Sequence, residues 1–181
     1  MSRWAVHLRA REAYRGDADG GADVPWRVFG IRPLAAMAFV TDPIWWLIAL
    51  AGLLGDAALR LAAPGLLASS AVHSAAQWLW CVLWAPALEE VTFRGILQGE
   101  FLQTRWGRSR VLGITGANVG CSILFVALHF LHHPADWALS VFAPSLVLGW
   151  LRERHSGAAS PIAMHIVFNL TFFMAASIGA A

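Results

Sequence analysis

Long apolar segments separated by short polar ones make up most of this chain. Five segments stand out, and they cover residues 34–54, 72–104, 112–131, 137–151 and 161–178. A helix needs about 20 mostly apolar residues to cross a bilayer, and all of these segments except 137–151 come close to or exceed that length. The pattern predicts an all-α fold: a polytopic membrane helical bundle of about five transmembrane helices.

Prolines and polar residues divide these segments further. Asp42-Pro43 interrupts the first segment, and a proline at such a position predicts a kink. Pro86 is expected to bend or break the long helix over 72–104 for the same reason. Residues 55–71 contain Gly, Pro and Ser, and they are expected to form a connection that includes a short interfacial helix.

Two polar stretches complete the layout. Residues 1–33 hold six Arg and a Gly/Asp-rich stretch, which predicts an Arg-rich cytoplasmic N-terminal tail ahead of a transmembrane domain at 34–181. The tail has no apolar h-region, so no cleavable signal peptide is expected. The stretch 132–136 is expected to form a tight turn, in which Asp136 is a turn residue or the N-cap of the next helix.

Composition supports the bilayer as the solvent of this chain. Apolar residues make up 58% of the sequence and charged residues 13%, whereas soluble domains carry about 25% charged residues. The formal net charge of +2 is too small to indicate a nucleic-acid partner. Cys81 and Cys121 both lie in apolar segments, and they have neither the number nor the spacing of a disulfide framework or a metal knuckle.

All 13 basic residues are Arg, and their distribution orients the chain. A cytoplasmic N-terminus puts eleven of them inside, namely Arg3, Arg9, Arg11, Arg15, Arg27, Arg32, Arg105, Arg108, Arg110, Arg152 and Arg154. Arg60 then lies outside and Arg94 within a span. This excess of Arg on one side is the positive-inside pattern. Splitting residues 72–104 into two crossings gives a six-span alternative that moves three of these Arg outside, so five spans is the better interpretation.

Ionisable residues within apolar segments are candidates for chemistry, because burying them in a membrane costs several kcal/mol. Three groups of them occur: Glu89, Glu90 and Arg94 in the second segment, His129 in the third, and His165 with Asn169 in the fifth. Each group has a structural alternative, such as an ion pair or a hydrogen bond between helices. Their joint presence on three helices favours a functional site.

Helix geometry separates the two glutamates. Glu90 and Arg94 are four residues apart, so their side chains share a face in the favourable order for an ion pair. Glu89 projects about 100° away from Glu90 and has no such partner in its own helix. An unpaired carboxylate in a low dielectric favours its protonated form, so Glu89 is the candidate general base.

The other two groups complete a hydrolytic site. His165 and Asn169 are also four residues apart, and together they can donate two hydrogen bonds to one oxygen, as an oxyanion hole requires. His129 lies on a third helix and can share a water molecule with Glu89. The combination predicts a hydrolase that activates water and uses no amino-acid nucleophile.

The motifs Glu89-Glu90-x-x-x-Arg94, Phe125-x-x-x-His129 and His165-x-x-x-Asn169 resemble, in order, those of the CPBP family. This family comprises CAAX prenyl proteases of the Rce1 type and bacteriocin-processing or immunity proteins, also called the Abi family. The resemblance covers about residues 72–178, which is the expected family core.

The resemblance implies a transmembrane protease domain with the activity of a glutamic-type intramembrane endopeptidase. In such an enzyme Glu89 and His129 would activate water, while His165 and Asn169 would stabilise the oxyanion. Glu90 and Arg94 would support the site, and no metal or other cofactor is expected. The substrate would be a membrane protein or peptide, cut in or beside a membrane-embedded segment.

Small bacterial members similar to this chain are associated with processing C-terminal sorting tags of membrane-anchored proteins. The expected location is therefore the bacterial inner membrane. The chain is shorter than eukaryotic CAAX proteases, and bacteria generally lack prenylated proteins, so prenylated CAAX substrates are not favoured.

Two alternatives remain open at this stage. Glu89, His129 and His165 together could ligate a metal, although the chain lacks a His-Glu-x-x-His helix and Arg94 adds positive charge. The same fold could also serve as a non-catalytic immunity or peptide-binding protein. A transporter is disfavoured, because the chain has few spans and no inverted repeat.

Overall fold

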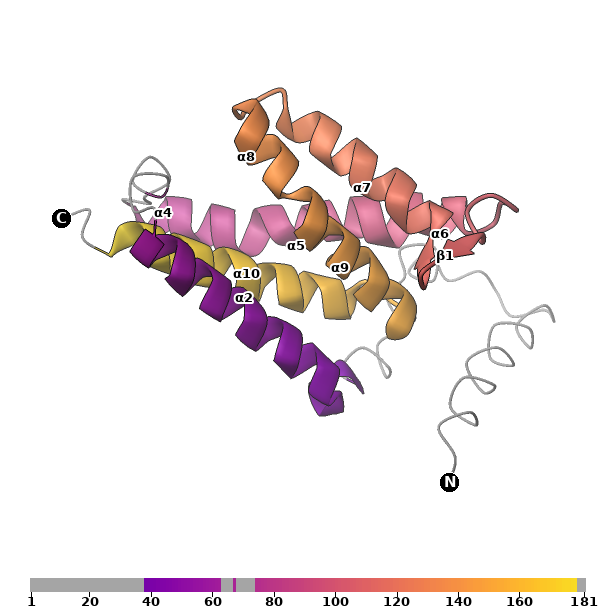
Figure 1. Cartoon of the computed structure of the whole chain (residues 1–181), viewed down its shortest axis with the longest axis horizontal. Coiled ribbons are helices and arrows are strands. Elements are labelled where there is room, and N and C mark those ends of the chain that lie inside the picture. Colours follow the sequence, from indigo (N-terminus) through magenta and orange to yellow (C-terminus); the bar gives the residue numbers. More distant parts are fainter. Residues whose placement is uncertain (1–37, 63–66, 68–73, 179–181) are drawn as a thin grey trace.

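The computed structural model describes residues 38–62, residue 67 and residues 74–178, so the predicted tail at 1–33 lies outside the described part. Figure 1 shows a bundle of helices. In chain order the elements are η3 (Ala38–Thr41), α2 (Pro43–Ala62), α4 (Ala75–Trp78), η4 (Leu79–Trp84), α5 (Ala85–Glu90), η5 (Val91–Leu97), α6 (Gln98–Phe101), β1 (Arg110–Val111), β2 (Ile114–Thr115), α7 (Gly116–His129), α8 (Ala135–Ser140), α9 (Phe142–Arg154) and α10 (Ala159–Ser177).

The first long helix differs from its predicted limits of 34–54. Helix α2 begins at Pro43 and continues to Ala62, so its last turns lie in the stretch expected to be a connection. Pro43 does not kink the helix because it occupies the first turn, where no hydrogen bond from its nitrogen is needed. Asp42 accepts a hydrogen bond from the Ile44 amide at 3.1 Å and so caps this end.

The predicted helix over 72–104 is confirmed as a continuous helical stretch from Ala75 to Phe101. It starts at a capping box, in which Ser74 and Gln77 bond each other's backbone amides. The stretch is not uniform: η4 and η5 are π-helical and lie on either side of α5. Pro86 is near the start of α5, directly after the first of these wide turns.

After the long stretch the chain forms a hairpin and then the helices α7, α8, α9 and α10. The predicted fourth span is two helices, α8 and α9, which meet at Val141. Strands β1 and β2 pair in an antiparallel hairpin that the sequence pattern did not predict. Its turn contains Gly113 at φ 84°, a left-handed conformation that glycine adopts without strain.

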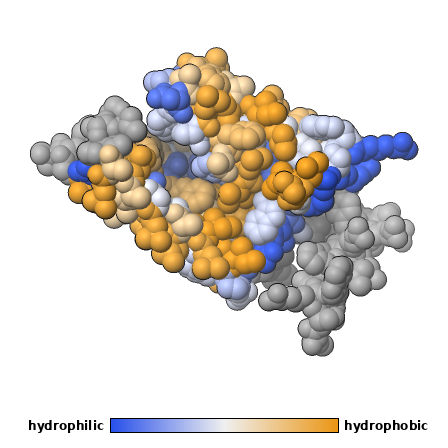
Figure 2. Space-filling model, viewed as in Figure 1, coloured by the Kyte–Doolittle hydropathy of each residue, from blue (hydrophilic) through white to orange (hydrophobic). Residues whose placement is uncertain are grey.

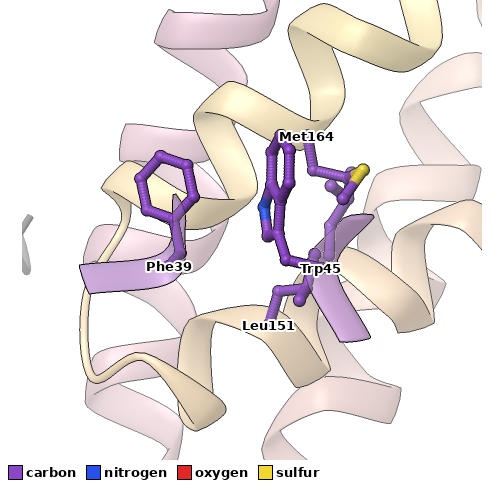
Figure 3. Packing of buried hydrophobic residues seen from close by; sticks show 5 residues of the cluster. Phe39, Trp45, Leu151 and Met164 are labelled. Carbon is purple, nitrogen blue, oxygen red and sulfur yellow. The ribbon is translucent and has the colours of Figure 1, made fainter. Parts of the chain in front are cut away.

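The larger apolar cluster among the described residues joins helices that are far apart in the sequence. Phe39, Trp45, Leu151 and Met164 are buried against one another, as Figure 3 shows. These residues come from η3, α2, α9 and α10, and α10 also contacts α5. Helix α10 therefore lies at the centre of the bundle, where it can present side chains to the long helix that carries α5.

The outer surface is strongly apolar. Large apolar side chains are exposed along several helices, including Leu47 at 63%, Trp80 at 57% and Leu139 at 59%, and hydrophobic residues cover much of the face in Figure 2. By length and apolarity, α2 and α10 are long enough to cross a membrane. The bundle fits a polytopic membrane protein, and the count of five crossings stays a prediction.

One end of the bundle collects the arginines of the hairpin and of the end of α9, whereas Arg60 bonds the Ile178 carbonyl at the other end. Asp42, at the start of α2, pairs with Arg154 at the end of α9. Glu153 pairs with Arg110 in the hairpin before α7. The start of α2 and the end of α10 lie at opposite ends of the bundle in Figure 1. Helices α2 and α10 thus each run from one end of the bundle towards the other.

Candidate active site

A fully buried ion pair lies at the middle of the long helix. The Arg94 guanidinium donates to Glu90 Oε1 at 2.9 Å, and the two side chains are 1% and 0% exposed. The sequence predicted this pairing from the four-residue spacing, and the structure has it. Breaking such a pair leaves an uncompensated buried charge, which typically costs about 3–5 kcal/mol.

His165 connects both glutamates to α10. Its Nδ1 lies 2.8 Å from Glu90 Oε1, and its Nε2 lies 3.8 Å from Glu89 Oε2. The Glu89 side chain is 35% exposed, whereas that of Glu90 is completely buried. Of the two carboxylates, therefore, only Glu89 is accessible to a water molecule and a substrate from outside the protein.

The contact with Glu90 constrains the protons on His165. Glu90 Oε1 is held by Arg94 and acts as an acceptor, so His165 Nδ1 carries a hydrogen and donates it. A neutral His165 would then have a lone pair on Nε2, and only the imidazolium would have an N–H there. The predicted role as an oxyanion donor through Nε2 consequently requires His165 to be positively charged.

Helices α7 and α9 hold the other side of Arg94. Its Nη2 donates to Ser145 Oγ at 2.7 Å and to the Ser145 carbonyl at 3.1 Å. Ser145 Oγ donates to Ser122 Oγ, which in turn donates to Asn118 Oδ1. The Arg94 guanidinium also lies 4.8 Å from the centre of the Phe125 ring, at a distance typical of cation–π contacts.

This series of hydrogen bonds from Arg94 to Asn118 was not predicted from the sequence. A signal was present in α9, where Ser145, Gly149 and Arg152 are spaced by four and three residues and so share one helix face. Gly149 accepts a bond from Gln98 through its carbonyl, and Arg152 donates to the Arg94 carbonyl. The face of α9 towards the long helix is therefore a row of hydrogen-bonding groups.

His129 is the last residue of α7. Its Nδ1 lies 2.8 Å from the Phe125 carbonyl, which can only accept, so Nδ1 donates and Nε2 of the neutral ring is free to take a proton. The Phe125 ring packs against His129 at 4.5 Å and against His165 at 6.1 Å. Trp137 stacks on the His129 ring from α8 at 5.8 Å. The two predicted histidines thus contact the same aromatic ring.

Asn169 is placed differently from a free oxyanion donor. Its Nδ2 donates to the Cys81 carbonyl in η4 at 2.8 Å. Asn169 and His165 share a face of α10, as their spacing predicted, and both contact the long helix, but one amide hydrogen of Asn169 is already used. Among the described residues, no group of three or more His, Cys, Asp or Glu side chains has the arrangement of a metal site.

A hollow opens on the face shown in Figure 2. It lies between α8 and α10, over the long helix, and hydrophilic surface inside it adjoins hydrophobic surface.

The helical bundle with a buried acid–base cluster fits a class, the polytopic membrane proteins with a polar site between their helices. The comparison with known families is more specific. Residues 71–171 match the family described as type II CAAX prenyl endopeptidase Rce1-like, which is more than half of the chain, and the protein belongs to this family. Membership confirms the resemblance seen in the motifs, and it implies a membrane-embedded protease. The searches of curated proteins and of solved structures returned no match.

Proposed function

We propose that this protein is a glutamic-type intramembrane endopeptidase, with Glu89 as the base that activates water. The observation that carries the proposal is the contrast between two adjacent carboxylates. Glu90 is buried and paired with Arg94, while Glu89 is partly exposed and 3.8 Å from His165. A base needs access to water and substrate, and a structural anion needs burial and partners.

The proposed reaction adds water across a peptide bond. Glu89, assisted by His129, takes a proton from water, and the oxygen attacks the carbonyl carbon of the substrate. The carbonyl oxygen becomes an oxyanion, which His165 and Asn169 stabilise through N–H groups. The C–N bond then breaks, and the proton held at Glu89 or His129 passes to the leaving nitrogen.

The substrate we propose is a polypeptide that is itself anchored in the membrane. The hollow over the long helix supports this, because it exposes hydrophilic surface in a largely apolar face. We further propose that the protein lies in the bacterial inner membrane with a cytoplasmic N-terminus, and that it removes C-terminal sorting tags. The Arg-rich end of the bundle supports the orientation.

The test compares three Glu→Gln variants on one helical stretch. A substrate is first captured by crosslinking to the Glu89→Gln variant in membranes, then purified and used in a cleavage assay. Glu89→Gln is expected to lower kcat by about 10²–10⁴-fold, the usual contribution of a general base. Its free energy of unfolding should stay close to that of the wild type, because the Glu89 carboxylate makes no short hydrogen bond to another described residue.

Glu90→Gln should act differently, and Glu100→Gln is the matched control. Loss of the Glu90 charge leaves Arg94 buried without its counter-ion, so the free energy of unfolding should fall by about 3 kcal/mol or more. Glu100 is exposed on α6 and its change should affect neither quantity. Full cleavage by Glu89→Gln would overturn the proposal.

The non-catalytic and metal-dependent alternatives give separate outcomes. A binding protein would retain its protective effect in cells when Glu89 is Gln, and the purified wild type would cut no captured partner. A metalloprotease would contain stoichiometric metal and lose activity with a chelator, whereas the proposed mechanism predicts chelator-resistant cleavage.

A further inference from the structure

The two π-helical segments bracket the glutamate pair, and each releases one backbone carbonyl. In an α-helix every carbonyl accepts from the amide four residues later, and in a π-helix from the amide five residues later. At the end of a π-helical segment one carbonyl loses its α-helical partner. The amide four residues after it donates instead to the carbonyl one residue earlier. An unsatisfied carbonyl is costly in an apolar environment.

At the end of η4 the released carbonyl belongs to Cys81. The Ala85 amide, its α-helical partner, donates to Trp80 instead. The next candidate is residue 86, a proline, which has no N–H to donate. The Asn169 side chain supplies the missing bond at 2.8 Å.

The same pattern occurs at the end of η5. The Gln98 amide, which in an α-helix would donate to the Arg94 carbonyl, donates to Phe93. The Arg94 carbonyl instead accepts from Arg152 Nε on α9 at 2.9 Å. Gly99 gives Arg152 room, since a Cβ at position 99 would lie 3.2 Å from its Nη2.

Gln98 is fixed to α9. A change of register in η5 would therefore move the residues before it, including the glutamates, and not Gln98. Its Nε2 donates to the Gly149 carbonyl at 3.0 Å and to Glu153 at 2.9 Å. Returning η5 to an α-helical register would restore the bond from Gln98 to the Arg94 carbonyl. It would also rotate Glu90 relative to Gln98, and so away from His165.

We propose that Arg152 is a positioning residue, which holds η5 in its π-helical register and thereby keeps Glu90 against His165 and Glu89 at the site. This inference rests on the proposed function for its catalytic consequence. The function of Arg152 is carried by its Nε–H donor to the Arg94 carbonyl, not by its charge.

Matched substitutions separate the donor from the charge. Gln places its Nε2 the same number of bonds from the backbone as Arg Nε, so Arg152→Gln keeps a donor and removes the charge. Arg152→Met has a similar length and no donor. Arg152→Lys keeps the charge but has its nitrogen one bond farther out, and it replaces the Met variant if that variant does not fold.

The first readout needs no substrate. The His165 Nδ1 proton reports the bond to Glu90 and is observed by NMR of 15N-histidine-labelled protein in nanodiscs, assigned through the His165→Asn variant. We expect the slowly exchanging Nδ1 signal to persist in Arg152→Gln and to be lost in Arg152→Met. An unchanged signal in Arg152→Met, equal loss in Arg152→Gln, or a wild-type signal in Arg152→Lys would overturn the proposal.

The second readout is cleavage of the substrate captured by Glu89→Gln. A displacement of catalytic groups by about 1 Å costs roughly 100-fold, so kcat of Arg152→Met should fall by about that factor while KM is unchanged. Arg152→Gln should recover most of the loss. If the wild type cleaves nothing, the proposed function fails, and the NMR experiment still decides the role of Arg152.

Discussion

At the scale of single residues, the site depends on how a buried arginine is neutralised. Arg94 donates to Glu90 on one side and to Ser145 on the other, and Glu90 also accepts a hydrogen bond from His165. This arrangement assigns the Nδ1 proton of His165 and leaves its Nε2 to face Glu89. The protonation state of one imidazole ring therefore decides whether His165 can help to stabilise an oxyanion.

A pH profile tests this assignment. Glu89 must be ionised to accept a proton, and His165 must be an imidazolium to donate from Nε2. We expect a bell-shaped dependence of kcat, because the site needs an ionised base and a cationic donor at the same time. The measurement is cleavage from pH 5 to pH 10. A plateau that extends to the alkaline end would contradict the oxyanion role of His165.

Asp42 illustrates a charged residue whose partner the sequence did not identify. Arg154 and His155, more than 100 positions away, both bond its carboxylate. The hydrogen bond from Arg154 is the main cause that lowers the pKa of Asp42 from 3.8 to about 2. Because the pKa is lower in the folded protein, the pair stabilises it above pH 3.8, and this contribution is lost as the pH falls towards 2.

Asp42→Asn should therefore lower the free energy of unfolding by about 1 kcal/mol at neutral pH, as expected for a partly solvated pair. The difference from the wild type should shrink between pH 4 and pH 2. Thermal unfolding in detergent across this range measures it, with Asp136→Asn on exposed α8 as the control. A difference independent of pH would show that the ion pair does not contribute.

At the scale of elements, the close approach of α7 and α9 is what brings Ser145 to Arg94. A Cβ at Gly149 would lie 2.0 Å from Asn118 Oδ1 and 2.5 Å from its Cγ. Asn118 is itself fixed, because its Nδ2 donates to the Leu146 carbonyl and its backbone amide donates to Thr115. No side chain larger than hydrogen fits between these helices without movement.

Gly149→Ala is thus expected to separate α7 from α9 and to destabilise the protein by about 1–3 kcal/mol, as overpacking usually does. Gly55→Ala is the matched control, since a Cβ there meets nothing within 4 Å. In a helix interior, Gly→Ala by itself is stabilising by up to about 1 kcal/mol. Thermal unfolding of both variants should show opposite signs, and a neutral Gly149→Ala would contradict the packing argument.

The sequence predicted the features that depend on local spacing. The continuous helix from Ala75 to Phe101 and the pair Glu90–Arg94 follow from apolar length and from the four-residue repeat. The π-helical segments and the bond between His165 and Glu90 did not follow, because they depend on side chains that other helices supply. The break at Val141 and the hairpin at 110–115 also gave too weak a local signal.

At the scale of the whole molecule, the Arg distribution and the bundle agree on two chemically different ends. Leu112, at the tip of the hairpin, is 99% exposed at the Arg-rich end. Leu61, at the far end of α2, is 85% exposed, and His132 is exposed after α7. These positions lie on turns or helix ends where a probe can reach them.

Cysteine labelling tests the orientation and the number of crossings. In a background with Ser at positions 81 and 121, Leu61→Cys and His132→Cys should react with a membrane-impermeant maleimide from outside the cell. Leu112→Cys should react only in inverted vesicles. Labelling of Leu112→Cys from outside would contradict the five-span topology and favour the six-span alternative.

The ion pair between Glu90 and Arg94 also has a consequence for biosynthesis. Chains emerge from the ribosome N-terminus first, so the helix over 75–101 enters the bilayer before Ser145 and His165 have been made. At that moment Glu90, one turn away, is the counter-charge that the same helix provides for Arg94. The pair therefore helps the helix to insert into the bilayer before the rest of the site exists. For a Glu90 variant, failed insertion of this helix at the translocon is the first defect that we expect.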